Sequence, residues 1–457
     1  MAGINFLLEK YVQKRTLSGS LIKEAVNVME AVGPWLLTVV CLGIMGITVF
    51  LVHGTSPVLF YLLITYATAL SLIISSPFHA MFTRYMADEI FLMRYQAITD
   101  GMISLCILIV IISSVVSSLI VFPLSQIPFD LKVGFVGMTA LMSLLWCIST
   151  TLSSLKREKI FLMVFTFGIV TTLTLFLIVR PVDTKGLLAI FSLTAVIPVA
   201  LGASYVIKVY LRDPIAIDWS FLKRRGLVNL GFAIFTFSLG FWSDKFIFWY
   251  MLGERGAVDT FFRYYTEYDL PFFVALLIMM IGSFLVYRGV KGKITGPYEA
   301  FIFKISNNFP FRELALEKYN LVRGINYVSS SIFIFYGGIS MFILFLIYIK
   351  VIPLPWRNPF VFHYLLLGTI FFSLYFFCFL VLQYLDDYAA LVKMNLLFFA
   401  LNAGVTLLSI HMGYSFYGTG FMSACIISSL VGFVMINSKM GGLEFEVFKK
   451  ALKQNKE

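Results

Sequence analysis

The chain alternates between long apolar stretches and short polar connections. Twelve stretches, each of about 18 to 26 residues, are long enough to cross a hydrocarbon core of about 30 Å as helices, which takes roughly 20 residues. Six lie at 33–53, 57–78, 100–122, 131–155, 160–179 and 186–209, and six at 227–251, 270–287, 325–350, 360–385, 391–411 and 414–436. The pattern predicts an all-α membrane protein with twelve transmembrane helices.

Basic residues follow the same alternation. Of the 35 Lys and Arg residues, 27 lie in the two tails and in every second connection, 7 lie in the intervening connections, and Lys245 lies inside a span. Because short loops rich in Lys and Arg stay in the cytoplasm, we expect both termini to be cytoplasmic. An even number of spans also places both termini on the same side of the membrane, so the two observations agree.

Composition supports a multi-pass protein of the cytoplasmic membrane. Hydrophobic residues make up 60% of the chain and charged residues 13%, more apolar surface than a soluble core can hide. The net charge of +11 reflects the loop bias, so we expect no nucleic-acid partner. The dense patch Lys223-Arg224-Arg225 is typical of contact with anionic membrane lipids.

The spans divide into two sets of six. We predict an N-terminal lobe at residues 1–209, a basic cytoplasmic linker at 210–226, a C-terminal lobe at 227–436 and a basic cytoplasmic tail at 437–457. The C-terminal lobe contains the longest cytoplasmic loop, 288–324. Pro297 and Pro310 are helix-start signals in this loop and predict two helices lying in the headgroup layer, with docking of a cytosolic partner as the alternative.

Polar residues precede the first span on one helical face. Asn27 and Glu30 are three residues apart, and Pro34 and Trp35 follow where the apolar stretch begins. A helix kinked at Pro34 could open the bundle at the cytoplasmic mouth of a transport path. The alternative is that these residues lie at the interface and that Pro34 occupies the first turn of the helix.

The seventh span is interrupted by charge. Asp244 and Lys245 lie between Trp242 and Trp249, and an ionised residue at mid-bilayer costs about 2.5 to 3.5 kcal/mol. Neighbours on a helix point about 100° apart, so we expect each to need its own partner, or Lys245 to reach the outer interface. We predict that Asp244→Ala impairs function without lowering the amount of protein in the membrane.

The outer connection that follows, 253–269, mixes carboxylates with aromatic rings. Glu267, Tyr268 and Asp269 end it. Such a mixture suits the exit of a sugar path, because rings stack on pyranoses and carboxylates bind hydroxyl or amino groups. An interfacial aromatic belt is the alternative.

Other charged or metal-binding residue types give weaker signals. Arg84 and Asp88, four residues apart between the second and third spans, predict a surface ion pair and are minor candidates for the path. The five Cys and four His residues show no metal-ligand spacing, and there is no phosphate-binding glycine loop. We therefore expect no cofactor, metal or catalytic residue.

The chain resembles a known family over nearly its whole length. The resemblance rests on Met1-Ala-Gly-Ile-Asn-Phe, Gly33-Pro-Trp35, Phe82-Thr-Arg-Tyr-Met-Ala-Asp88, Asp244-Lys-Phe-Ile-Phe-Trp249 and Tyr268-Asp-Leu-Pro271. These segments are similar to the PelG family of inner-membrane transporters of Pel exopolysaccharide systems, within the multidrug/oligosaccharidyl-lipid/polysaccharide (MOP) exporter superfamily. Asn5 departs from a more usual Gly.

The resemblance implies two six-helix lobes around a central cavity. It implies export of a hexosamine-rich polymer made by a PelF-like cytosolic glycosyltransferase, with PelD-like and PelE-like membrane proteins as partners. Three alternatives remain: a lipid-linked oligosaccharide flippase or cation-coupled drug exporter, a noncatalytic scaffold of a synthase, and a membrane-embedded glycosyltransferase. The last is disfavoured because the first outer loop contains no carboxylate.

Overall fold

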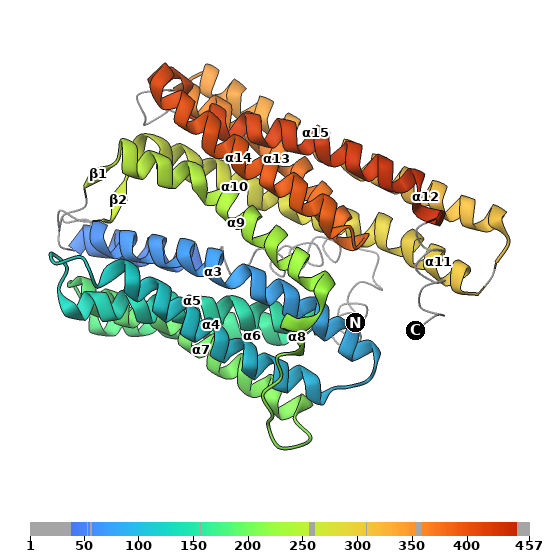
Figure 1. Ribbon diagram of the computed structural model, residues 1–457. Coiled ribbons are helices and arrows are strands. Elements are labelled where there is room, and N and C mark those ends of the chain that lie inside the picture. The colour runs from blue at the N-terminus through green and yellow to red at the C-terminus, as the bar shows by residue number, and fades with distance from the viewer. Residues whose placement is uncertain are drawn as a thin grey trace, which may run out of the picture. The chain divides into compact units, whose positions relative to one another are not determined.

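The computed structural model describes residues 38–52, 54, 57–155, 157–255, 261–307, 309–351 and 359–445. An apolar helix at Thr38–Val52 begins the described part. Then follow α3 (Val58–Phe91), α4 (Gln96–Val121), α5 (Phe129–Ser154), α6 (Glu158–Val179), α7 (Thr184–Tyr210), α8 (Ser220–Lys223) and α9 (Arg225–Met251). After the strands β1 (Glu254–Arg255) and β2 (Arg263–Tyr264) come α10 (Thr266–Gly289), the π-helix η1 (Val290–Ile294), α11 (Thr295–Ser306), α12 (Phe311–Tyr348), α13 (Pro359–Tyr384), α14 (Tyr388–Met412), the 3₁₀ turn η2 (Tyr414–Phe416) and α15 (Thr419–Gly441) (Figure 1).

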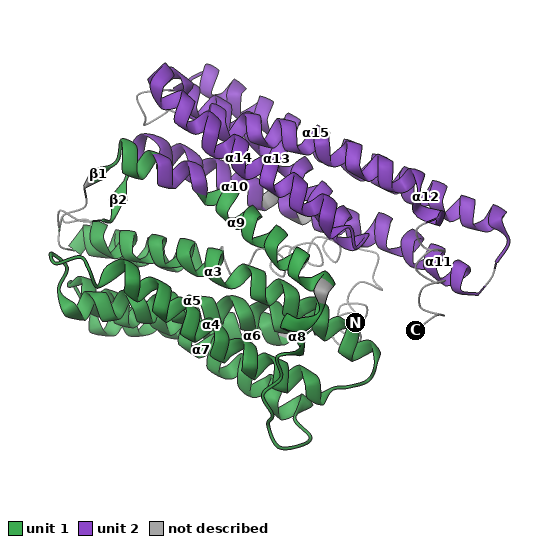
Figure 2. Ribbon diagram, viewed as in Figure 1, with its two compact units in different colours: residues 1–242, 248–265 green, residues 243–247, 266–457 purple. Residues whose placement is uncertain are grey.

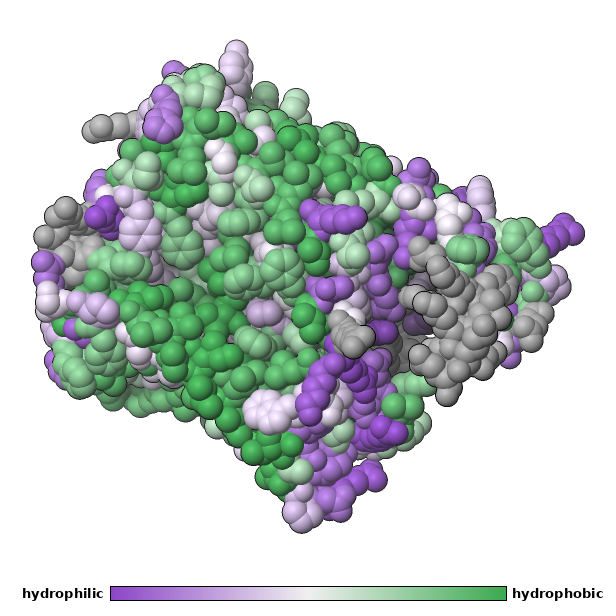
Figure 3. Space-filling view, in the orientation of Figure 1, coloured by the Kyte–Doolittle hydropathy of each residue, from purple (hydrophilic) through white to green (hydrophobic). Residues whose placement is uncertain are grey.

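The predicted multi-pass, all-α fold is confirmed. In the described residues, eleven helices are long and apolar enough to cross a membrane, and the shorter apolar helix Thr38–Val52 falls within the remaining predicted span, the first one at 33–53. Green apolar side chains cover much of the face shown in Figure 3. An exposed apolar surface of this kind is stable only against lipid.

The chain divides into two compact units (Figure 2). Unit 1 contains residues 1–242 and 248–265, and unit 2 contains residues 243–247 and 266–457. In unit 1, α5 packs against α3, α4 and α7, and α6 packs against α7. In unit 2, α15 packs against α13 and α14, while α13 also contacts α10 and α12.

The prediction of two separate headgroup-layer helices in loop 288–324 is wrong. Helix α10 continues through η1 into α11, and α12 starts directly after Pro310 and runs unbroken to Tyr348. Phe301 is fully buried and Ile305 is 9% exposed, because α11 packs back on α12. Pro310 was correctly predicted to start a helix. The polar residues after it, however, extend the ninth span at its N-terminal end instead of forming a separate helix.

Candidate functional site

Asp244, Lys245 and Tyr268 form a buried polar cluster within unit 2. Asp244 is fully buried and Lys245 is 3% exposed, although both lie inside a transmembrane helix. The Lys245 ammonium donates to Asp244 Oδ1 at 2.9 Å, and the Tyr268 hydroxyl donates to Asp244 Oδ2. The carboxylate therefore receives one charged and one neutral donor, one on each oxygen.

Aromatic rings enclose the ammonium group of this cluster. Tyr268 and Phe272 are four residues apart on α10, so they share one face, and their rings stack at 5.9 Å. The Lys245 ammonium lies 3.4 Å from the ring centroid of Phe272 and 5.5 Å from that of Phe421, which lies in the first turn of α15. A cation over an aromatic face is stabilised by about 2 kcal/mol when desolvated. The two rings thus take part of the place of water around Lys245.

Two expectations about the charged pair are wrong. Asp244 and Lys245 do neutralise one another, since the four-carbon Lys stem swings its ammonium back to the preceding carboxylate. Lys245 also does not reach an interface, because its ammonium lies among rings of unit 2. The rule that neighbours on a helix point apart holds for Cβ atoms and short side chains, but not for the end of a lysine.

The remaining acidic candidates lie beside this cluster in the chain. Glu267 accepts a hydrogen bond of 2.6 Å from the Tyr414 hydroxyl. Asp269 lies with Glu267 in the first turn of α10, where a negative charge is favoured by the helix dipole. These contacts connect the start of α10 with η2 of the same unit.

Of the aromatic residues of the outer connection, Phe262 and Tyr268 are buried, and the others are partly exposed. Its two ends pair as β1 and β2, with Glu254 opposite Tyr264 and Arg255 opposite Arg263. Phe262 is fully buried against Tyr66 and Phe135. Neither a sugar-stacking surface nor an interfacial belt describes Phe262, because the hairpin folds it back onto α3 and α5.

Trp242 belongs to the aromatic packing of unit 1. Its ring lies 6.3 Å from that of Trp249, which in turn stacks on Tyr66 at 4.8 Å. Residues 242, 244 and 245 all lie on α9. Trp242 nevertheless belongs to unit 1, whereas Asp244 and Lys245 belong to unit 2. Asn27, Glu30, Pro34 and Trp35 lie outside the described residues.

Arg84 and Asp88 belong to a second polar cluster, at the end of α3 in unit 1. The expected pair is weak, with 3.8 Å between Arg84 Nε and Asp88 Oδ1. Arg224 binds better: it contacts Asp88 at 2.8 Å and the nearly buried Glu89 at 2.5 Å, and its guanidinium lies 4.8 Å from the Tyr85 ring centroid. Lys223-Arg224-Arg225 was predicted to contact lipid. In the structure Arg224 instead pairs with Asp88 and Glu89 of the same unit.

The segment 211–219, which we call the strap, is held by the start of α4. Gln96, Asp100 and Ser104 are four residues apart and share one face of α4. Gln96 Oε1 accepts from the backbone N–H groups of residues 212 and 213 at 2.8 and 3.1 Å, Asp100 accepts from that of residue 216 at 3.1 Å, and Ser104 accepts from that of residue 218 at 2.8 Å. Side chains of α4 thus accept hydrogen bonds from backbone N–H groups of the strap, as backbone carbonyls would in a helix or sheet.

Asp218 joins the strap to α3. It accepts a hydrogen bond of 2.5 Å from the Tyr85 hydroxyl. Burial opposes ionisation of Asp218, but hydrogen bonds from Ser220 and Tyr85 and the charge of Arg224 outweigh it, so the pKa of Asp218 is lowered. Sequence reasoning missed Asp218, Glu89 and Arg224 as a group, since Arg224 lies 135 residues from Glu89.

Arg224→Lys is expected to lower the stability of unit 1 by about 1 to 2 kcal/mol. A lysine can donate to one carboxylate as a point charge, but it cannot bind two carboxylates and stack on Tyr85 together. Thermal unfolding of the purified protein in detergent would measure the loss. Lys223→Ala, an exposed neighbour, is the control and should change little. Equal unfolding temperatures for the two variants would contradict the assignment.

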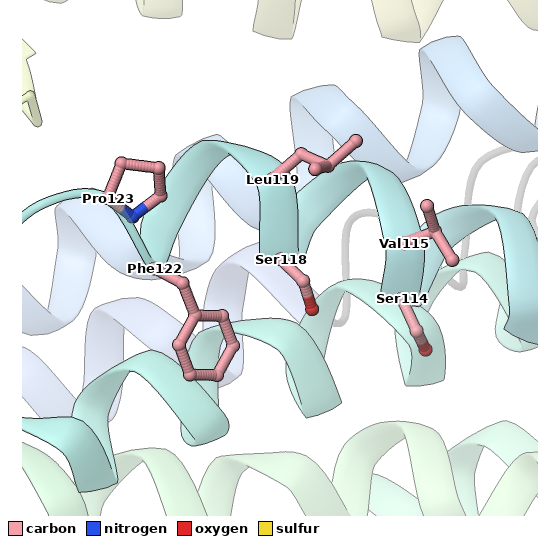
Figure 4. A pocket seen from close by; sticks show the side chains of 6 residues that line it. All are labelled: Ser114, Val115, Ser118, Leu119, Phe122 and Pro123. Carbon is pink, nitrogen blue, oxygen red and sulfur yellow. The ribbon is translucent and has the colours of Figure 1, made fainter.

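The pocket in Figure 4 does not coincide with either cluster. It has a volume of about 470 Å³ and is lined by Ser114, Val115, Ser118, Leu119, Phe122 and Pro123. All six residues come from α4 and the two residues after it, and Leu119 is 73% exposed. The pocket is a depression on the apolar side of one transmembrane helix. In the described residues, no group of three His, Cys, Asp or Glu side chains could hold a metal ion.

Comparisons with known proteins agree with this geometry. The family model PelG, described as "Putative exopolysaccharide Exporter (EPS-E)", matches residues 1–448. A MATE structure in the bent conformation is 13% identical with a TM-score of 0.59, covering 94% of this chain and 97% of that one. The MATE transporter ClbM in complex with Rb⁺ is 12% identical with a TM-score of 0.56, covering 90% and 94%. An outward-facing multidrug resistance MATE family transporter of the MOP superfamily is 11% identical with a TM-score of 0.55, covering 93% and 96%. No curated protein matches the sequence. These similarities confirm the predicted MOP-exporter-like fold.

Proposed function

Because the chain belongs to the PelG family of exopolysaccharide exporters, we propose that it exports a Pel-like, hexosamine-rich polymer across the cytoplasmic membrane. The observation that carries the proposal is the family match over residues 1–448, which includes most of both compact units. Family and fold support a membrane transporter over an enzyme. We also propose coupling to a PelF-like cytosolic glycosyltransferase, with PelD-like and PelE-like proteins as membrane partners.

We further propose that Asp244, Lys245 and Tyr268 belong to the transport path. A buried ion pair contributes little net stability, because desolvation offsets its attraction, so its presence inside a span favours a functional role. When the cluster opens to the path, a sugar hydroxyl can replace the Tyr268 hydroxyl as a donor to Asp244.

Tyr268→Phe is expected to lower polymer export about fivefold or more without lowering the amount of protein in the membrane. The change removes one donor to Asp244 but leaves Lys245 to neutralise the carboxylate. Tyr375→Phe is the matched control: its hydroxyl donates to Asn395 at 2.7 Å and is equally buried in unit 2. Equal export by the two variants would remove Tyr268 from the path.

The export assay uses inverted vesicles containing the full chain and the purified glycosyltransferase. UDP-linked N-acetylhexosamine is supplied outside, and polymer protected from added glycosidase is measured. Protected polymer that disappears when the chain is omitted supports export. Polymer that stays accessible to the glycosidase contradicts it. Protection of a lipid-linked oligosaccharide, or drug resistance gained on expression, would instead favour the flippase or drug-exporter alternatives.

A further inference from the structure

Unit 2 carries a helical hairpin that is longer than a membrane is thick. Helix α12 has 38 residues and is about 57 Å long at 1.5 Å per residue, whereas a hydrocarbon core takes about 30 Å. Its antiparallel neighbour is the run α10, η1 and α11, which is helical from Thr266 to Ser306. The surplus length lies at the end where α11 turns into α12 (Figure 1).

The charges on α12 show where the surplus begins. The last charged residue of the helix is Arg323, and residues 324–348 are uncharged, so the hydrocarbon core begins no earlier than about Gly324. Phe311 lies 13 residues further out, about 20 Å along the helix axis. The polar layer of a bilayer adds only about 5 to 8 Å on each side. The end of the hairpin is therefore in water, on the side that the basic loops assign to the cytoplasm.

Three phenylalanines are exposed at this end, which we call the hairpin tip. Phe303, Phe309 and Phe311 are 61%, 39% and 67% exposed, and the rings of Phe303 and Phe309 lie 6.3 Å apart. Figure 3 shows green atoms beside purple ones at this end of the molecule. Clustered exposed aromatic side chains in water are typical of protein interaction sites, where such side chains dominate binding energy.

The hairpin is held in place by ion pairs behind the tip. Lys304 contacts Glu317 at 2.9 Å and Glu313 at 3.3 Å, which connects α11 to α12. Lys318 contacts Glu444 at 2.8 Å, which connects α12 to the segment after α15. The tip is therefore presented on a fixed support, as a preorganised docking surface requires.

One positive charge at the tip has no ion-pair partner. Arg312, next to Phe311, is exposed and makes no ion pair within the described parts of the chain, whereas Lys304 is held by two glutamates. A second copy of this chain would present the same basic loops and be repelled. The complementary surface is an apolar pocket with carboxylates at its rim.

We propose that the hairpin tip, Phe303, Phe309 and Phe311 together with Arg312, docks a cytosolic protein whose apolar pocket is rimmed by carboxylates. This inference rests on the proposed function in taking the polymer-making glycosyltransferase as that protein. Docking there would hold the enzyme on a rigid arm, about 20 Å along the helix axis from the edge of the hydrocarbon core.

The test measures binding of the purified glycosyltransferase to the full chain in lipid nanodiscs. The triple variant Phe303→Ser, Phe309→Ser and Phe311→Ser should raise the Kd at least tenfold. Arg312→Glu should raise it at least threefold, with a smaller dependence on salt. The matched control is Phe91→Ser, since Phe91 is 85% exposed at the end of α3, outside the tip.

The outcomes separate the two proposals. Binding of the tip variants equal to that of the wild type overturns the docking site while leaving the coupling in place. Absence of wild-type binding overturns the coupling and the assigned partner together, whereas the vesicle assay judges export alone. Quenching of Phe311→Trp fluorescence by brominated lipids would place the tip in the bilayer and overturn the proposal.

Discussion

Lys245→Met is expected to lower the free energy of unfolding by about 3 to 5 kcal/mol. The variant removes one partner of a buried ion pair and leaves the fully buried Asp244 carboxylate with only the Tyr268 hydroxyl. Fluorescence-detected size exclusion after heating in detergent would measure the loss, and the amount of protein in the membrane should fall with it. Asp244→Ala should act in the same way, so the sequence-based expectation of an unchanged protein level is withdrawn.

The double variant Asp244→Leu with Lys245→Met is the control for this prediction. Replacing both partners with apolar side chains leaves no uncompensated charge, so most of the lost stability should return. Polymer export by this folded variant then reports on function alone: export at the wild-type level would make the pair structural. A single Lys245→Met variant as stable as the double variant would show that Asp244 is not charged in the folded protein.

Gly324→Ala is expected to separate α12 from the π-helical segment η1. A Cβ atom at Gly324 would lie 2.3 Å from the backbone carbonyl oxygen of Lys293, a contact that only a shift of one helix can relieve. Overpacking of this kind costs about 1 to 3 kcal/mol. A lower unfolding temperature and faster proteolysis of the hairpin would measure the separation.

The same helix supplies a matched control for the glycine substitution. Gly337→Ala lies further along α12, where nothing is within 4 Å of the added Cβ. Alanine in an open helical position gains about 0.5 to 1 kcal/mol over glycine, so this variant should be as stable as the wild type or more stable. A loss of stability shared by both variants would contradict the assignment of the effect to the contact with Lys293.

The spans could be read from the sequence because membrane crossing is a local property. A run of about 20 apolar residues must be helical in lipid, whatever it packs against, since the backbone has no other partner there. Pro310 marked the start of α12 for an equally local reason, because it lacks an N–H and has a fixed φ. How far the helix continued was not predicted, since its packing on η1 depends on Gly324, which gives no such signal.

The candidate clusters could be predicted only in part. Asp244 was conspicuous because charge inside a span is costly, but its partners depend on the reach of a lysine and on a ring from α15, 177 residues away. Arg224 appeared as one member of a basic run, and nothing local distinguished it from its neighbours. Phe262 was predicted to contact either sugar or the membrane interface, because it is aromatic and lies in a loop. The pairing of β1 with β2 instead buries it against α3 and α5.

The hydrogen bonds between α4 and the strap have a consequence for folding during synthesis. Gln96 and Arg212, which meet through Gln96 Oε1, are 116 residues apart in the chain. At a synthesis rate of roughly 5 to 20 residues per second, the polar face at the start of α4 waits about 6 to 23 s for its partners. During that interval water or a chaperone must supply the hydrogen-bond partners of Gln96, Asp100 and Ser104. The polar face of α4 is therefore paired only after six spans have left the ribosome, and a truncated chain ending before the strap would expose this face to the quality-control proteases of the membrane.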